Sequence, residues 1–252
     1  MLYLLRKQII FFCFLLTTIS LKAQKDFNRP DHDNLPYYFG LTFGYANMNL
    51  HTGKSPTFLQ YDSVLSVEPG SSGGFSAGLL ATLKLNNRFE LRAAPELIIG
   101  GAKSFTYSLK YPNANETSIE KKTLVSTIFS LPFEVKFNSD RIDNFRVYML
   151  GGVSYDLDLA SNSNERNAED LIKLKKADYA LEAGVGFNFF LKFVTISPEI
   201  KIHNGMTNIH DRDKHLKFSS VFANIQSQMI IFSINIEMEL SLCFSSLLFL
   251  FI

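Results

Sequence analysis

Residues 194–203 read Val-Thr-Ile-Ser-Pro-Glu-Ile-Lys-Ile-His, so apolar and polar side chains alternate along the whole stretch. Successive side chains of a β-strand point to opposite faces. One face of this segment is therefore apolar, and the other carries Thr195, Ser197, Glu199, Lys201 and His203. The pattern predicts a strand with one apolar face, but it does not say which face points inward.

The first residues have the layout of a secretory signal peptide. Arg6 and Lys7 precede an almost wholly apolar run over residues 9–21, and Ala23 offers a small residue before a cleavage point at Gln24. The apolar run is short for a membrane-spanning helix, although an uncleaved anchor is the alternative. We expect residues 1–23 to be the signal peptide and the protein to be exported to the outer membrane.

Cysteine content and charge exclude several classes of protein. The two cysteines are Cys13 and Cys243, and Cys13 leaves with the expected signal. The mature chain then has no internal disulfide and no cysteine-based zinc site. The net charge of +1 shows no basic excess, so no nucleic-acid partner is expected.

The alternating pattern predicts eight strands between short turns and longer polar loops. The expected strands are 37–50, 73–85, 89–111, one ending at 137, 145–158, 178–190, 194–203 and one within 218–238. The three turns are 86–88, 138–144 and 191–192, and the four loops are 51–71, 112–118, 160–176 and 204–217.

Even strand number, short turns at one end and long loops at the other are typical of bacterial outer-membrane barrels. We therefore predict an all-β, eight-stranded, antiparallel transmembrane outer-membrane β-barrel whose apolar face meets lipid. The alternative is a soluble, secreted β-sandwich or lipocalin-like barrel, in which the apolar face points inward. No Trp is present, so an aromatic belt at the membrane surface needs tyrosines; the candidates are Tyr37, Tyr38, Tyr45, Tyr107, Tyr111, Tyr148, Tyr155 and Tyr179.

If the apolar face meets lipid, many charged side chains point into the lumen. The predicted inward set is Lys84, Glu90, Arg92, Glu96, Glu134, Lys136, Arg146, Asp156, Glu182, Glu199, Lys201 and Glu237. An eight-stranded barrel has an interior that side chains just fill, and buried charges must pair. We expect a salt-bridged plug; a narrow conduit or a small-ligand site is the alternative, and a porin-sized channel is disfavoured.

One loop carries a cluster that is suggestive of chemistry: His203, His210, Asp211, Asp213 and His215. Such a cluster could act as a general base or bind a metal at the rim of a membrane-barrel hydrolase. Arg212, Lys214 and Lys217 oppose cation binding, however, and exposed loops are normally polar. We therefore predict no catalytic, cofactor-binding or metal-binding residues, no cofactor and no small-molecule substrate, and keep a hydrolase site near His210 as an alternative.

Several strings of residues resemble the PorT family, called SprT in gliding bacteria, of the type IX secretion system of Bacteroidetes. The strings are residues 36–45, 68–75, 139–149, 168–171 and 197–201, and the likeness extends over about residues 34–239. The resemblance implies a non-enzymatic outer-membrane barrel required for type IX secretion and, in gliding species, for surface motility. Its partners would be outer-membrane lipid and other type IX secretion components. A passive barrel anchor or adhesin with exposed loops is the alternative function.

The expected organisation has four parts. A signal peptide (1–23) is followed by a flexible periplasmic lead (24–34) and the β-barrel (35–239). Residues 240–252 form an apolar tail that departs from the family and is too short to span a membrane as a helix.

Overall fold

The computed structural model describes residues 27–55, 64–111, 117–160, 174–210 and 221–238. The expected signal peptide and apolar tail lie outside these residues. A short 3-10 helix precedes ten β-strands, which are η1 (Pro30–Asn34), β1 (Tyr37–Lys54), β2 (Val64–Gly70), β3 (Ser72–Lys84), β4 (Phe89–Ala93), β5 (Glu96–Leu109), β6 (Ile119–Asn138), β7 (Phe145–Asp158), β8 (Ala177–Phe190), β9 (Thr195–Gly205) and β10 (Phe222–Met238).

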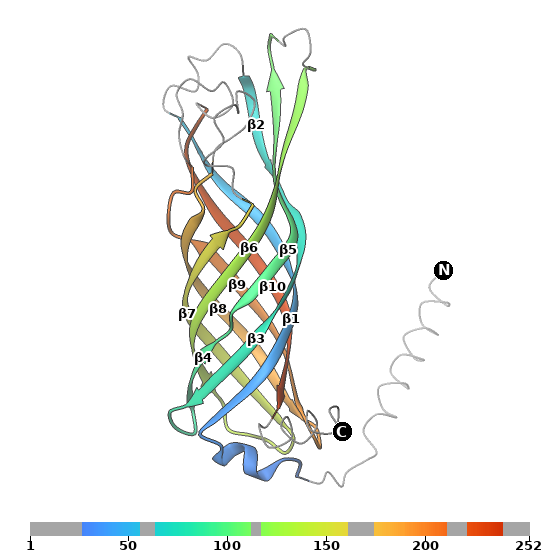
Figure 1. The fold of residues 1–252 in the computed structure, drawn as a ribbon, viewed down its shortest axis with the longest axis vertical. Coiled ribbons are helices and arrows are strands. Elements are labelled where there is room, and N and C mark those ends of the chain that lie inside the picture. The colour runs from blue at the N-terminus through green and yellow to red at the C-terminus, as the bar shows by residue number, and fades with distance from the viewer. Residues whose placement is uncertain (1–26, 56–63, 112–116, 161–173, 211–220, 239–252) are drawn as a thin grey trace, which may run out of the picture.

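The strands form one antiparallel sheet that closes on itself, because β1 pairs with β10 on one side and with β3 on the other. Only Ser71 separates β2 from β3, and only Ala94 and Pro95 separate β4 from β5. β4 and β5 both pair with β3 on one side and with β6 on the other, so together they form one interrupted strand of the ring. β2 follows β3's position at the long-loop end and pairs with β5, so β2 and β3 together also occupy one position in the ring. The result is the predicted eight-strand barrel (Figure 1).

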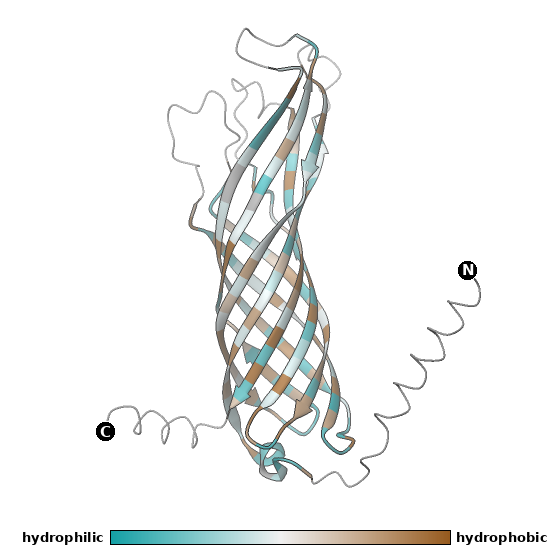
Figure 2. Cartoon of the chain, turned by 90° about the vertical axis from the view of Figure 1, so that its right-hand side faces the viewer, coloured by the Kyte–Doolittle hydropathy of each residue, from teal (hydrophilic) through white to brown (hydrophobic). Residues whose placement is uncertain are grey.

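The apolar face of the strands points outward. Along β9, Lys201 is 3% exposed whereas its neighbour Ile202 is 54% exposed. Figure 2 shows apolar and polar residues alternating along the strands of the barrel wall. A soluble sandwich or lipocalin-like barrel would bury the apolar face, so that alternative is wrong. No helix in the described part of the chain is long and apolar enough to cross a membrane.

The strands extend further than the sequence pattern predicts at the long-loop end. β1 continues to Lys54 and β2 begins at Val64, inside the expected loop 51–71. These extensions are polar or mixed in sequence, but β1 pairs there with β10 and β2 pairs with β5. Backbone pairing with a neighbouring strand stabilises them without a clean alternation of side chains. The short turns lie at the opposite end, together with η1 and the end of β10 (Figure 1).

Candidate functional site: a filled lumen and its N-terminal plug

The predicted inward charges do lie inside the barrel. All of them except Lys84 are buried, and several form ion pairs with one another. Lys84 is half-buried at the short-turn end, where its ammonium group donates to the backbone carbonyl of Asp33. Alternation in the sequence, together with the expectation that the apolar face meets lipid, therefore identified most of the charged lining of the lumen.

Arg92 joins opposite walls of the barrel. Its Nε donates to Glu134 on the adjacent strand β6 at 2.6 Å, and its Nη2 donates to Glu199 on β9 at 2.7 Å. In the ring order β4 and β9 are separated by β6, β7 and β8, so they face each other across the lumen. A hydrogen-bonded pair that spans the barrel leaves no continuous water column at this level.

Two lysines make similar connections. Lys201 on β9 lies 3.2 Å from Glu134 and 3.5 Å from Glu182. Lys136 on β6 lies 3.5 Å from both Glu90 and Glu237, and Glu237 is on β10 at the far side of the ring. Each lysine is thus shared between carboxylates of different strands, which satisfies buried charges that would otherwise be costly.

Two tyrosines and a histidine add contacts to these buried ion pairs, and we call the whole set of side chains the ion-pair layer. The hydroxyl of Tyr38 donates to Glu90 at 2.8 Å, and that of Tyr148 donates to Glu199 at 2.7 Å. His203 lies 2.9 Å from Glu182 through Nδ1 and 2.9 Å from Asp156 through Nε2. His203 is fully buried, so its predicted place on the polar face of a strand is confirmed and its place in a rim cluster is wrong.

The half of the lumen nearer the long-loop end is also filled with side chains. Lys103 pairs with Asp158 at 2.8 Å, and the spaces beside this pair measure only about 10 and 20 Å³. A cavity of that size holds about one water molecule. Two clusters of buried apolar side chains lie in the same half of the barrel: the first contains Ala46, Met48, Ile98, Ile128, Met229 and Ile231, and the second contains Leu50, Val64, Val67, Phe105, Tyr107, Leu109, Leu174, Ile209, Val221, Phe222 and Ile225.

His210 belongs to this apolar region and not to an open rim. It is 2% exposed, and its ring meets Phe222 edge-on with a centroid distance of 6.0 Å. A substrate at the surface cannot reach such a ring, so the hydrolase site proposed near His210 has no support. Asp211, Asp213 and His215 lie outside the described residues. Among the described residues, no group of three or more His, Cys, Asp and Glu side chains could hold a metal ion.

The short-turn end of the lumen is closed by the segment that precedes β1. Arg29 donates to the hydroxyl of Thr195 at 2.6 Å, and His32 is 3% exposed beside Tyr38, with ring centroids 4.9 Å apart. We call residues 28–34 the N-terminal plug. The plug lies within the segment that was expected to be a flexible lead, and in the structure it makes polar contacts and packs its His32 ring on Tyr38.

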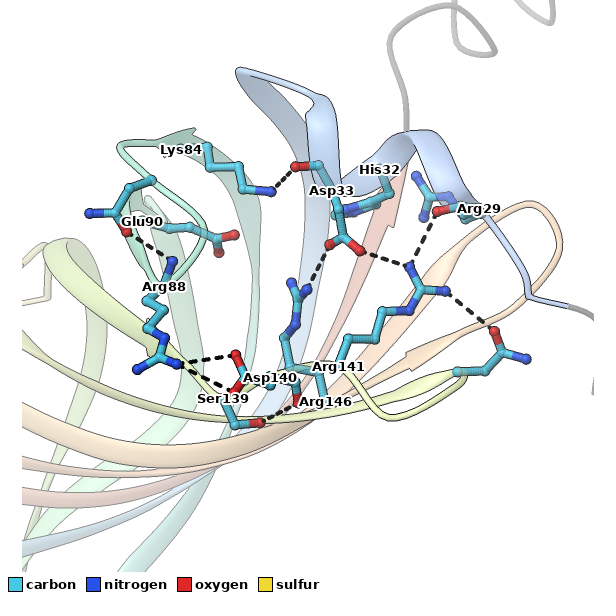
Figure 3. A network of polar contacts seen from close by, with 12 residues as sticks. Arg29, His32, Asp33, Lys84, Arg88, Glu90, Ser139, Asp140, Arg141 and Arg146 are labelled. Carbon is cyan, nitrogen blue, oxygen red and sulfur yellow. Dashed lines mark hydrogen bonds and ion pairs between the residues drawn. The ribbon is translucent and has the colours of Figure 1, made fainter.

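Two arginines from the barrel wall hold the plug. The carboxylate of Asp33 accepts hydrogen bonds from Arg146 at 2.7 Å and from Arg141 at 3.2 Å (Figure 3). Arg141 also donates to the backbone carbonyls of Asn28 and Arg29, and its guanidinium lies 3.7 Å from the centroid of the Phe190 ring. Arg141 is in the turn before β7, where an unusual backbone at Asp143 (φ 53°) accompanies the tight bend.

The electrostatics of the plug follow from this packing. Burial and the nearby Arg29 and Lys136 charges lower the pKa of His32 to about 3, so the ring is neutral at neutral pH. Burial alone would raise the pKa of Asp33, but Arg146 and Arg141 together hold it below its usual value. The plug therefore presents a neutral imidazole to the lumen and a carboxylate to the arginines.

Sequence reasoning missed the plug, Lys103, Asp158 and the inward position of some tyrosines. Tyr38, Tyr107 and Tyr148 are buried inside, so they are not part of a membrane belt. The alternation of β1 contained a signal for Tyr38, because Tyr37 and Phe39 flank it on the apolar face. The exposed tyrosines that remain candidates for a belt are Tyr37, Tyr45, Tyr111 and Tyr179.

The chain matches the family described as "Outer membrane protein beta-barrel domain" over residues 19–211. The chain belongs to this family. It is therefore an outer-membrane β-barrel protein, and the geometry of the wall, apolar outside and charged inside, agrees with that placement. No curated protein matches the chain.

Solved structures of small outer-membrane barrels are similar in fold. OprG from Pseudomonas aeruginosa is 17% identical, with a TM-score of 0.41, and the match covers 80% of this chain and 94% of OprG. Neisserial surface protein A is 14% identical, with a TM-score of 0.38 and coverage of 80% and 96%. Ail, the attachment invasion locus protein of Yersinia pestis, solved with the heparin analogue sucrose octasulfate, is 11% identical, with a TM-score of 0.36 and coverage of 81% and 99%.

Proposed function

We propose that this protein is a non-enzymatic component of the type IX secretion machinery, a barrel that acts through its surfaces and not through its lumen. The observation that carries the second half of the proposal is the Arg92–Glu199 pair, which joins opposite walls at 2.7 Å. The first half is supported by the strings of residues that resemble the PorT family, above all 139–149 and 197–201.

A closed lumen restricts what the barrel can do. The plug, the ion-pair layer and the apolar clusters fill successive levels of the interior, so neither a folded nor an unfolded cargo chain can pass through it. Other type IX secretion components are then the partners, and they contact the outer wall, the turns or the loops.

The test is deletion of the gene followed by assay of secreted proteins and, in a gliding species, of surface motility. Loss of both, restored by the wild-type gene, supports the proposal. Unchanged secretion would reject it and leave a passive anchor. One feature favours that second candidate: β5 and β6 rise beyond the rest of the barrel at the long-loop end, where they could display an adhesive surface (Figure 1).

A further inference from the structure

The outer wall of the barrel contains one pronounced hollow among the described residues, on the lipid-facing side near the short-turn end. Its volume is about 520 Å³, and its lining is almost wholly apolar. Pockets for small ligands in proteins typically measure about 300–1,000 Å³. The hollow is thus large enough for a ligand, but it opens to the membrane and not to the lumen.

The pairing of the strands explains the hollow. Phe39 on β1, Ala81 on β3, Ala93 on β4 and Phe133 on β6 form one cross-strand row on the outer face. Two alanines therefore lie side by side between two phenylalanines. Adjacent strands are about 4.8 Å apart, so the strands that carry the two rings are separated by roughly 14 Å. The missing side-chain volume of the alanines makes the floor, and the rings make the walls.

The row nearer the turn closes the hollow only partly. It consists of Tyr37, Leu83, Leu91 and Val135, which also line the space. Below it, the β3–β4 turn carries Arg88, whose side chain is 59% exposed. Its guanidinium reaches Asp140 at 3.3 Å, but Asp140 is 84% exposed, and an ion pair between two such exposed groups contributes little. Figure 3 shows Arg88 paired with Asp140, and an anion at the surface of the membrane can compete with this exposed carboxylate for the guanidinium.

We propose that the hollow binds one phospholipid of the periplasmic leaflet. An acyl chain lies over Ala81 and Ala93 between Phe39 and Phe133, and the phosphate contacts Arg88. The short turns identify this end as periplasmic, since outer-membrane barrels have short periplasmic turns. Charge complementarity favours a phospholipid over an apolar segment of a membrane protein, because every phospholipid carries its phosphate next to its hydrocarbon chains, whereas an apolar segment need not carry an anion there. The inference depends on the membrane placement of the barrel and not on a role in secretion.

The experiment fills the hollow and counts lipid. The double variant Ala81→Leu/Ala93→Leu places larger side chains on the floor, and Ala77→Leu is the matched control, because Ala77 is an exposed, lipid-facing residue of β3 that does not line the hollow. Each protein is purified from outer membranes in mild detergent, and phospholipid bound per barrel is measured by mass spectrometry. Heat-modifiable gel migration confirms folding, and Ala93→Leu alone replaces the double variant should that one misfold.

We expect the wild-type protein and Ala77→Leu to retain lipid equally. Retention by the filled variant should fall about tenfold, the effect expected when roughly ten close carbon–carbon contacts with the acyl chain are lost. Arg88→Gln should reduce retention of anionic more than of zwitterionic phospholipid. Equal retention by the filled variant and Ala77→Leu would overturn the proposal. So would a filled variant that keeps its lipid but loses a co-purifying membrane protein, which would assign the hollow to a protein partner.

Discussion

Arg146 donates to the carboxylate of Asp33 at 2.7 Å, which ties the N-terminal plug to the wall of the barrel. Asp33 and Arg146 are separated by more than a hundred residues in the chain, yet their contact helps to close one end of the lumen. Asp33 keeps 29% of its side chain exposed, so solvent can reach the pair and the plug can be tested separately from the buried ion pairs.

Replacing Asp33 with Asn should loosen the plug without unfolding the barrel. The amide keeps the shape of the carboxylate but loses its charge, so the bonds from Arg141 and Arg146 weaken. Asp33 is 29% exposed but its partners Arg141 and Arg146 are buried, so the loss should lie between about 1 kcal/mol, typical of an exposed ion pair, and about 3–5 kcal/mol, typical of a buried one. Hydrogen exchange followed by mass spectrometry should show faster exchange in residues 28–35 only. Faster exchange throughout β7 as well would mean that the plug supports the wall.

Acid should release the plug. His32 has a pKa of about 3 in the packed plug but about 6.5 when free, so the released segment binds the extra proton. The packed plug therefore becomes less stable as the pH falls from 6.5 towards 3. The ratio of packed to released plug falls by up to about tenfold per pH unit. The lowered pKa of Asp33 acts in the same direction, because protonation of the carboxylate removes its attraction to the arginines.

The pH dependence can be measured as exchange of residues 28–35 between pH 7 and pH 4, after correction for intrinsic exchange rates. His32→Gln is the control, because glutamine does not titrate and should flatten the profile between pH 6.5 and the range in which Asp33 titrates. An identical profile in wild type and His32→Gln would refute the role assigned to His32.

Breaking the cross-barrel ion pair should be costly. Arg92→Met removes the cation paired with buried Glu199, whereas Glu134 keeps Lys201 at 3.2 Å, and loss of one partner of a buried pair typically costs about 3–5 kcal/mol. The exposed Arg88→Gln should cost about 1 kcal/mol or less. Urea unfolding in lipid vesicles, followed by gel migration, gives both values. Adding Glu199→Gln to Arg92→Met should recover part of the loss, because the carboxylate that lost its cation is then neutral.

The wild-type barrel should not conduct in planar bilayers. Side chains that span the lumen, such as Arg92 with Glu199 and Lys136 with Glu237, leave no open path for ions. We expect no large, stable steps in single-channel recordings at neutral pH. Removal of residues 24–34 alone should not open the lumen either, since the ion-pair layer remains. Stable open steps in the wild-type protein would contradict the filled lumen.

Substitution of His210 should affect stability and not chemistry. His210→Ala removes a buried ring that packs on Phe222, and a loss of about 1–3 kcal/mol is typical for such a change. Secretion in a complemented deletion strain should persist if the variant reaches the outer membrane at wild-type levels. His210→Phe, which keeps a ring against Phe222, is the matched variant. Loss of function in both variants, despite normal levels, would reopen the possibility of a chemical role.

Much of the barrel could be read from periodicity. Alternation put Glu199 and Lys201 on one face and Ile200 and Ile202 on the other, because the two faces of a strand are set by local geometry; the export signal and the long loops then indicated that the charged face is the inner one. The same reasoning predicted the eight-strand ring and twelve inward charges, of which all but Lys84 are buried. It underestimated strands such as β2, whose pairing with β5 depends on a neighbour and not on its own pattern.

The partners inside the lumen could not be read in this way. That Arg92 meets Glu199, more than a hundred residues away, depends on which strands face each other after the ring closes and on their stagger. The same holds for the hollow at Ala81 and Ala93, which exists because two alanines on different strands fall into one cross-strand row. The plug was missed because its short polar segment has no periodic pattern.

The amino-acid sequence by itself determined most of the strands and their two faces, because these follow from alternation within each segment. The export signal and the long loops, also read from the sequence, indicated that the charged face is the inner one. Only the tertiary structure decided that Arg92 and Lys136 bridge opposite walls, that residues 28–34 enter the lumen and that the outer wall is hollow beside Phe39. The physical reason is that closure of the sheet brings together residues whose distance along the chain carries no information about their distance in space.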